Sequence, residues 1–304
     1  MRVFVAGATG VVGRRLIPLL VDAGATVTAV ARTGQKAAQL KKQGATPKKV
    51  DLFDPAAVEA AVAGNDAVIN IATKIPTGNR MFLPGAFREN IKIRTEASQN
   101  LASAAIAARA RVFIQESFAP AYPDRGDEWI DESVPIEPSS YVRSVVDAES
   151  AAREFTRSGG AGVVLRFSFF YGPQSAQSAD MVNYVRRGLA PLPGGGEAYM
   201  STLWIDDAAS AVFAALNVPA GVYNVTDDVP MRRREAFNLL ADELAVKHPR
   251  MLPRWAGRLL GSLGDTIGRS QRISNAKFRQ AAGWVPKVAS VVDGWPRLVK
   301  ELRG

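Results

Sequence analysis

A glycine-spaced turn near the start of the chain constrains the fold more than any other feature. The stretch GATGVVG places Gly7, Gly10 and Gly13 between the apolar run RVFVAG and the helical pattern VVGRRLIPLLVDAG. The first glycine permits a tight turn, the second lets the backbone approach a pyrophosphate, and the third lets the helix pack on the strand. Because the free N–H groups of the helix would then face the phosphates, the turn predicts a dinucleotide site.

Strand and helix patterns alternate from this turn onward. Further strands are predicted at TVTAVAR, KKVDL, DAVINIAT, RVFIQES and VVLRFSFF, with helical patterns between them and one long helix over about 88–109. Such βαβ repetition predicts an α/β fold with a doubly wound parallel sheet, the Rossmann fold. We expect a cofactor-binding domain over 1–171 and a smaller, interleaved substrate region over 172–304, with 201–226 returning to the first domain.

Composition narrows the classes of function. The 304 residues include no cysteine and one histidine, His248, so we expect no metal site, no disulfide and no Ser-His-Asp triad. The net charge is +9, but Lys and Arg are spread along the chain, so we expect neither a nucleic-acid partner nor stable membrane insertion. The sequence enters its first strand without a signal-peptide pattern, and we expect a cytoplasmic protein.

The end of the second strand indicates which cofactor is bound. An acidic residue there would bind a ribose 2′-hydroxyl and select NAD, but this chain has Ala31 and Arg32, with Lys36 near. An arginine can pair with a 2′-phosphate through two hydrogen bonds. The sequence therefore favours NADP (NADPH) over NAD.

Several motifs together resemble one enzyme family. GATGVVG, LRFSFFYGP, STLWIDDAASA, GVYNV and NAKFRQAAGWVP resemble, in this order, signatures of the extended short-chain dehydrogenases/reductases, the NAD-dependent epimerase/dehydratase kind. The resemblance runs nearly end to end. It implies a set of cofactor contacts at the glycine turn and the strand ends: Gly7, Ala8, Thr9, Gly10, Val11, Val12, Gly13, Ala31, Arg32, Asp51, Leu52, Ile71, Ala72, Thr73, Lys74, Gln115, Tyr141 and Phe169.

The catalytic run of this family is altered here. The family's YxxSK, with a glutamate four residues later, matches Tyr141, Ser144 and Glu149, so Val145 replaces the lysine. The family's second catalytic position, a Ser or Thr four residues before a tyrosine, falls on Phe118, and Ser117 stands one residue off.

Loss of the lysine predicts a change in chemistry. A lysine about 4 Å from a phenol with a pKa of about 10 would favour the phenolate by roughly 4 kcal/mol at an effective dielectric constant of 20. Without it, Tyr141 should be protonated at pH 7, a poor base that can still donate a proton to a forming alkoxide. Lys74 or Arg94, the latter where the family often has asparagine, are the candidates to replace the lysine's contact with the nicotinamide ribose.

Three functions remain open on this basis. The first is an NAD(P)H-dependent oxidoreductase acting on a carbonyl or hydroxyl group of a small non-nucleotide molecule, with Tyr141 as proton donor and Ser117 as hydrogen-bond donor. The second is a catalytically idle NADP-binding protein that senses redox state. The third is a nucleotide-sugar epimerase or dehydratase, which Met200 disfavours because the family's sugar enzymes carry an arginine there.

Substrate contacts and assembly are also predicted. An apolar pocket could be lined by Phe82, Phe118, Phe169 and Phe170, and the basic segment 251–272 is expected to cover the substrate cleft. Arg94 and Arg272 are the candidate polar contacts for a substrate. Family members are often dimers, so a homodimer is expected.

Overall fold

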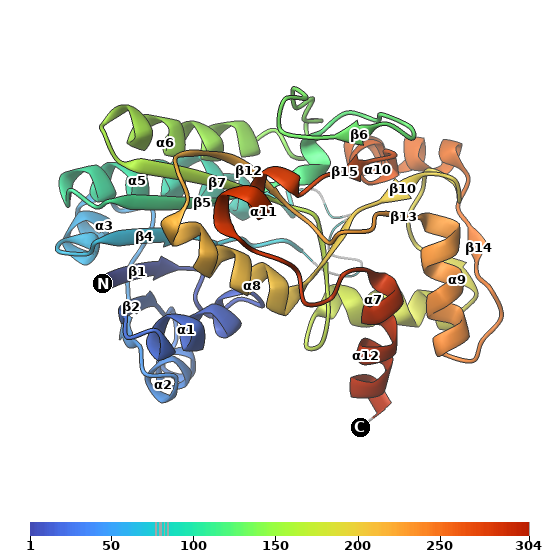
Figure 1. The fold of residues 1–304 in the computed structure, drawn as a ribbon, viewed down its shortest axis with the longest axis horizontal. Helices are drawn as coiled ribbons and strands as arrows, with labels where there is room; N and C mark the ends of the chain where they lie inside the picture. The colour runs from blue at the N-terminus through green and yellow to red at the C-terminus, as the bar shows by residue number, and fades with distance from the viewer. Residues whose placement is uncertain (77, 79–80, 82, 84, 304) are drawn as a thin grey trace.

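A parallel sheet forms the centre of the molecule, a computed structural model that describes residues 1–76, 78, 81, 83 and 85–303. In order across the sheet its seven strands are β12 (Gly221–Val225), β7 (Ala161–Phe167), β5 (Val112–Phe118), β4 (Ala67–Asn70), β1 (Arg2–Ala6), β2 (Thr26–Val30) and β3 (Thr46–Lys48). Neighbouring strands all run parallel (Figure 1). The chain builds β1 to β3 outward and then returns to β4 beside β1. This reversal creates a crevice at the carboxyl ends of β1 and β4.

Helices cover both faces of the sheet, which confirms the doubly wound Rossmann fold. The strands are apolar on both faces because each face is buried, as in β4, where all four residues are buried. One face packs on α1 (Gly13–Asp22), α2 (Gly34–Lys42), α8 (Ile205–Ala214) and α11 (Ala276–Ala282). The other packs on α3 (Pro55–Val62), α5 (Ser98–Ala107) and α6 (Val145–Arg157).

Two predicted strands end elsewhere than expected. The third strand, predicted as KKVDL, is Thr46–Lys48 instead, because the Asp51 carboxylate accepts a hydrogen bond from the Phe53 N–H (3.0 Å) and turns the chain. The predicted VVLRFSFF is interrupted at Ser168. The residues after the break form β8 (Phe169–Tyr171), which pairs with β11 (Thr202–Trp204) in a separate sheet.

Two predicted helices also differ. The long helix predicted over 88–109 is made of α4 (Arg88–Lys92), the π-helical turn η2 (Ile93–Ala97) and α5. The Ser98 backbone N–H donates to the Ile93 carbonyl five residues earlier, which is the π spacing, and the Ser98 hydroxyl donates to the same carbonyl (3.3 Å). The helical pattern between the fifth and sixth predicted strands, SYVRSVVDAESAAREFTRSGG, includes Tyr141. Helix α6 begins only at Val145, so the tyrosine lies in the turn before it.

A second core holds the rest of the chain. Helices α7 (Ala176–Arg186), α9 (Arg233–Glu243) and α12 (Val291–Arg303) surround the fully buried Trp295. Two-residue strand pairs join the loops: β9 (Leu189–Ala190) with β14 (Arg250–Met251), β10 (Tyr199–Met200) with β13 (Met231–Arg232), and β6 (Trp129–Ile130) with β15 (Arg272–Ile273). Short helices η3 (Ala119–Ala121), η4 (Ala215–Asn217), η5 (Arg254–Leu260) and α10 (Gly261–Gly268) complete the chain.

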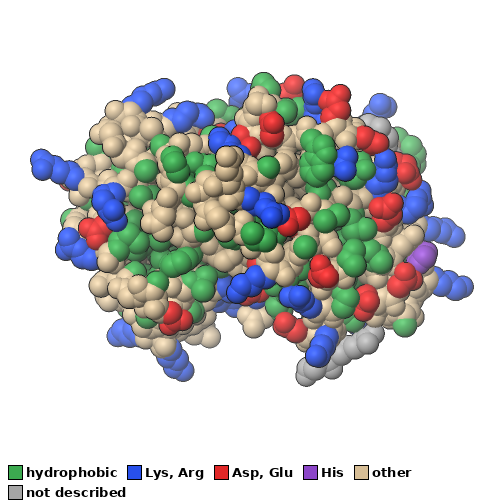
Figure 2. All heavy atoms as spheres, viewed as in Figure 1, with side chains coloured by type: hydrophobic (Ala, Val, Ile, Leu, Met, Phe, Trp, Pro, Cys, Tyr) green, Lys and Arg blue, Asp and Glu red, His purple; other side chains and the backbone are tan. Residues whose placement is uncertain are grey.

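The surface carries mixed charge. Figure 2 shows Lys and Arg side chains spread over one face of the molecule, interspersed with Asp and Glu. Over the described ranges no helix combines the length and apolar character needed to cross a bilayer.

Candidate active site

The glycine turn builds a cradle at the carboxyl end of β1. Gly7 has φ +89°, and a Cβ there would lie 2.5 Å from the Ile71 backbone. A Cβ at Gly13 would lie 2.3 Å from the Gly7 carbonyl oxygen. Helix α1 has no side-chain cap and no acidic residue in its first turn, so its N–H groups are not used by an anionic side chain. This cradle fits the pyrophosphate of a dinucleotide.

Three charged side chains meet at the rim of this cradle. Arg32, just beyond β2, donates to Glu89 at the start of α4 (Nη1 to Oε1, 3.2 Å), and Lys74, just beyond β4, pairs with the other oxygen of Glu89. These hydrogen bonds, with that of Lys74 the stronger, lower the pKa of Glu89. Each of the three side chains keeps a third or more of its surface exposed. The predicted cofactor cations therefore share a carboxylate that the sequence analysis did not identify.

The other predicted cofactor residues lie at neighbouring strand ends. Ile71, Ala72 and Thr73 follow β4, and Asp51 and Leu52 follow β3. Gln115 is buried, accepts a hydrogen bond from the Asn70 amide (2.9 Å) and donates to the Glu116 carbonyl (2.8 Å). Gln115 therefore braces β4 against β5 beneath the crevice.

Tyr141 lies at the entrance to α6 in an apolar setting. Its ring meets Phe87 edge-on, with centroids 4.6 Å apart, and packs beside Val142 and Val145. Burial raises the pKa of Tyr141 to about 12, and the positive charge of Arg94 opposes this only in part. Val145, where the family has lysine, is fully buried among Ala121 and Val142. A lysine at position 145 would place the first carbons of its side chain among these apolar residues.

A buried ion pair lies beside the tyrosine. Arg94, from the π-helical turn η2, is only 3% exposed and donates to Glu116 on β5 (Nη2 to Oε1, 2.6 Å). Its guanidinium is the charged group that acts on Tyr141. The sequence analysis predicted Arg94 but missed Glu116. The signal available was an acid inside the otherwise apolar strand VFIQES.

The predicted catalytic serine, Ser117, belongs to a second buried hydrogen-bond network. The Ser117 hydroxyl donates to Glu149 (2.8 Å), which also accepts two hydrogen bonds from Arg166 (2.8 Å each). Arg166 reaches the hydroxyl of Tyr122 (2.7 Å). Ser117 is fully buried, so we assign it to this network, which ties β5, α6 and β7 together, rather than to a substrate contact.

The predicted substrate residues separate into two groups. Phe118 packs beside Tyr141 and meets Phe169 edge-on (5.7 Å between centroids). Phe170 instead packs on Phe167 in the core of the sheet. Arg272 stacks on Trp129 (4.2 Å from the guanidinium carbon to the ring centroid), away from the Tyr141 cluster. Phe82 lies outside the described residues.

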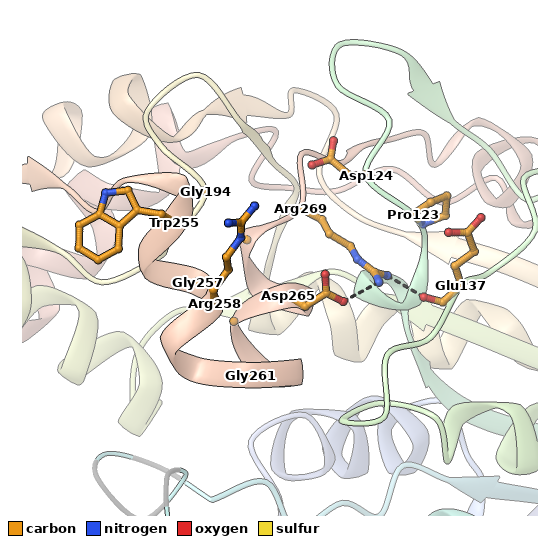
Figure 3. A pocket seen from close by; sticks show the side chains of 12 residues that line it. Pro123, Asp124, Glu137, Gly194, Trp255, Gly257, Arg258, Gly261, Asp265 and Arg269 are labelled. Carbon is orange, nitrogen blue, oxygen red and sulfur yellow. Dashed lines mark hydrogen bonds and ion pairs between the residues drawn. The ribbon is translucent and has the colours of Figure 1, made fainter.

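An open pocket adjoins the segment that carries Tyr141. Its volume is about 1120 Å³ (Figure 3). Three parts of the chain line it: Pro123, Asp124 and Glu137; Gly194; and Trp255, Gly257, Arg258, Gly261, Gly264, Asp265, Gly268 and Arg269. The Ser139 hydroxyl, two residues before Tyr141, donates to the Ser262 carbonyl (3.1 Å) and meets the Thr266 hydroxyl on α10. The segment 251–272, which was predicted to cover the substrate cleft, therefore lines this pocket and contacts the residues just before Tyr141. Across the described parts of the chain no group of three or more His, Asp or Glu could hold a metal ion.

Comparison with known proteins identifies the family. A model of the NAD dependent epimerase/dehydratase family matches residues 3–226. The chain belongs to this family. A 3-diazoavenalumate denitrifying reductase from a Streptomyces species is 34% identical, over 98% of this chain and all of the relative. A ketoreductase from Stigmatella aurantiaca that acts on a farnesylated dihydroquinoline oxide is 26% identical, over 89% of this chain and 81% of the relative.

Solved structures of the family share the fold. A human epimerase family protein crystallised with NADPH has a TM-score of 0.79 at 20% identity, and the match covers 99% of each chain. The UDP-glucose 4-epimerase of Thermotoga maritima has a TM-score of 0.81 at 20% identity, covering 100% of this chain and 99% of the other. At this level of identity the likeness establishes the architecture, and the chemistry has to be argued from the side chains.

Proposed function

We propose that this protein is an NADPH-dependent reductase of a small non-nucleotide carbonyl compound, with Tyr141 as the proton donor. The observation that carries the proposal is a phenol with a pKa raised to about 12 beside the buried cation Arg94. Such a phenol is protonated at neutral pH, so it serves as an acid and not as a base. Two relatives named as a ketoreductase and a 2-alkyl-3-oxoalkanoate reductase support this class.

Arg94 gives the proton transfer its electrostatic support. Bound NADPH would supply the hydride. As the substrate oxygen gains negative charge, Tyr141 donates its proton and becomes a phenolate. The positive charge of Arg94 stabilises that phenolate, while the Glu116 carboxylate keeps the guanidinium buried and oriented. In this proposal Arg94 supplies the charge that the missing lysine would have provided.

The rim residues support NADP over NAD. The free α1 N-terminus would hold the pyrophosphate, and Arg32 would pair with the 2′-phosphate. Neither Ala31 nor Arg32 offers the carboxylate that would bind a ribose hydroxyl. Glu89 must release Arg32 for this pairing, at small cost because the ion pair is exposed to solvent.

Replacement of Tyr141 by Phe tests the proton donor. We expect kcat for carbonyl reduction to fall roughly 10²–10⁴-fold, the usual contribution of a positioned acid, with NADPH affinity unchanged. Tyr184→Phe, a half-buried tyrosine on α7, is the matched control and should keep full activity. Full activity of Tyr141→Phe on a verified carbonyl substrate would remove the tyrosine from the mechanism.

A second candidate is reductive loss of nitrogen from a diazonium group. The denitrifying reductase relative covers nearly the whole chain, and the site lacks the lysine that would make Tyr141 a base. When hydride replaces N₂, the C–N bond breaks as the C–H bond forms, and no proton is needed. Tyr141→Phe should then leave the rate on an aryl diazonium salt unchanged. Tight NADPH binding without turnover of carbonyl or diazonium compounds would favour the idle cofactor-binding protein.

A further inference from the structure

The buried pair of Arg94 and Glu116 is held by a two-point contact. Both side chains are almost fully buried, with 3% of Arg94 and 9% of Glu116 exposed. Arg94 Nη2 donates to Glu116 Oε1 (2.6 Å), and Nε lies 3.4 Å from Oε2, so both carboxylate oxygens face one edge of the guanidinium. Such a contact fixes the orientation of an arginine and not only its distance. Glu116 therefore decides where the positive charge of Arg94 lies.

In the described part of the chain, Arg94 from η2 is the charged group that acts on Tyr141. The elements packed on the tyrosine present apolar side chains instead: Phe87 just before α4, Phe118 on β5, Ala121 in η3, Ile136 in the following loop, and Val142 and Val145 at the entrance to α6. The ionisation of Tyr141 therefore depends on how much of the Arg94 charge reaches the phenol.

The other buried acid near this part of β5 already has partners. Ser117, the residue after Glu116, donates to Glu149 on α6 (2.8 Å), and Glu149 accepts two hydrogen bonds from Arg166 on β7 (2.8 Å each). A buried carboxylate that is paired in this way is not available to a second cation. Glu149 therefore cannot replace Glu116 as the partner of Arg94.

Two opposing effects decide whether the phenol of Tyr141 keeps its proton. Burial in apolar surroundings favours the neutral phenol, and a nearby cation favours the phenolate. With Glu116 in place, Arg94 offsets the burial only in part, and the pKa of Tyr141 is raised to about 12. A guanidinium without its carboxylate would act more strongly, because no opposite charge would reduce its field. Glu116 is therefore expected to favour the protonated phenol.

We infer that Glu116 is a positioning residue that keeps Tyr141 an acid, by fixing Arg94 against β5 and cancelling part of its positive charge. Reduction of a carbonyl group needs a protonated phenol. Oxidation of the alcohol needs a phenolate, which takes the hydroxyl proton as the hydride leaves to NADP. The ion pair thus commits the site to reduction. This direction rests on the proposed function, while the charge balance itself exists without turnover.

Titration of Tyr141 tests the charge balance without a substrate. The tyrosinate absorbance in the near ultraviolet is followed against pH, and the curve of the matching Tyr141→Phe protein is subtracted to remove the other tyrosines. We expect Glu116→Gln to lower the pKa of Tyr141 from about 12 to about 10–11, because the charge of Arg94 is then unbalanced. Glu154→Gln, which changes an exposed acid on α6, is the control and should leave the curve unchanged.

A double replacement separates charge from packing. Arg94→Met combined with Glu116→Leu removes both charges and keeps apolar volume, a change that buried ion pairs often tolerate. Tyr141 should then titrate no earlier than in the unaltered protein. Earlier titration would attribute the shift to looser packing and overturn the inference, as would an unchanged curve for Glu116→Gln. If Glu116→Gln does not fold, Glu116→Asp takes its place, since its shorter side chain draws the carboxylate back from Arg94, and the same outcomes decide.

Turnover separates this inference from the proposed function. On a verified pair of carbonyl compound and alcohol, Glu116→Gln should raise the rate of alcohol oxidation near neutral pH about tenfold for each pH unit by which the pKa of Tyr141 falls, because the phenolate fraction rises in proportion. If no carbonyl compound is reduced but the titration shifts, the proposed function fails and the charge balance stands. If carbonyl compounds are reduced and Glu116→Gln keeps the titration curve and pH profile of the unaltered protein, Glu116 serves only the fold and the inference is wrong.

Discussion

Two halves of this molecule are held together in different ways: the seven-stranded sheet with its helices, which we propose as the cofactor half, and the core around Trp295 with its loops, which we propose as the substrate half. In the first, backbone ladders dominate, and β5 pairs with β7 over seven residues. In the second, strand pairs are two residues long, and arginine side chains bridge loops. Arg233, for example, is fully buried and donates to the carbonyls of Pro193 and Arg269.

This difference suggests which half of the molecule can stay constant in a family and which half can vary. A backbone ladder depends on strand pattern and tolerates many sequences, so the cofactor half can stay constant across a family. A loop held by one side chain changes its course when that residue changes. The loops of the second core can thus change without disturbing the sheet.

The largest expected effect comes from adding a methyl group at Gly7 in the cofactor half. The same change at Gly264 in the substrate half should cost much less stability. Gly7→Ala places a Cβ against the Ile71 backbone at φ +89°, and we expect a loss of about 3 kcal/mol in the free energy of unfolding. Gly264→Ala makes an even closer contact but should shift only η5 and α10, with little change in the free energy of unfolding. Urea unfolding measures both.

Gly34→Ala provides the control for the methyl group itself. It has open space around its Cβ position and should change the free energy of unfolding by less than about 1 kcal/mol. If Gly264→Ala destabilised the chain as much as Gly7→Ala, the two halves would unfold as one unit and the contrast between them would fail.

A smaller effect is expected at the rim of the cofactor half. Arg32→Ala should raise the Kd of NADPH about tenfold and leave that of NADH unchanged, because only NADPH carries the 2′-phosphate. Glu89→Gln should instead tighten NADPH a few-fold by freeing Arg32. Glu96→Gln, whose carboxylate pairs with Lys92, is the control. Equal or tighter binding of NADH by the unaltered protein would reject the NADP assignment.

The smallest effect concerns a buried acid between the halves. Asp227 follows β12, is 1% exposed, and accepts a hydrogen bond from Thr202 on β11. Burial raises the pKa of Asp227 well above its usual value, so the folded state holds its proton more tightly than the unfolded state does. Its contribution to stability is complete below the unfolded pKa of about 4 and is lost as pH rises through the folded pKa.

Replacement by the neutral isostere isolates this contribution. Compared with the unaltered protein, Asp227→Asn should become relatively more stable as pH rises from 5 to 8, measured by urea unfolding at each pH. Asp147→Asn, an exposed acid on α6, should follow the unaltered protein at every pH. A parallel pH dependence for Asp227→Asn would show that Asp227 is ionised in the fold.

Local patterns in the sequence determined the fold and the cradle. Glycine spacing, apolar runs and helical periodicity act between near neighbours in the chain, so the turn at Gly7 and the parallel sheet could be predicted directly. The break at Ser168 could not be predicted this way, because it depends on the distant strand β11 that pairs with β8. The bounds of the third strand were missed for a local reason, since the turn at Asp51 rests on a hydrogen bond between residues two apart. The cofactor contacts beyond the cradle stay predictions.

Only the tertiary structure decided which side chains surround Tyr141. The sequence indicated a phenol without its lysine, but Glu116 and Arg94 are 22 residues apart, and their pairing appears only when η2 packs on β5. In the same way, Glu149 accepts a hydrogen bond from Ser117, 32 residues away, and the Ser262 carbonyl on α10 accepts one from Ser139, 123 residues away. Buried charges need partners, and the partners available are set by how the elements pack and not by the order of residues along the chain.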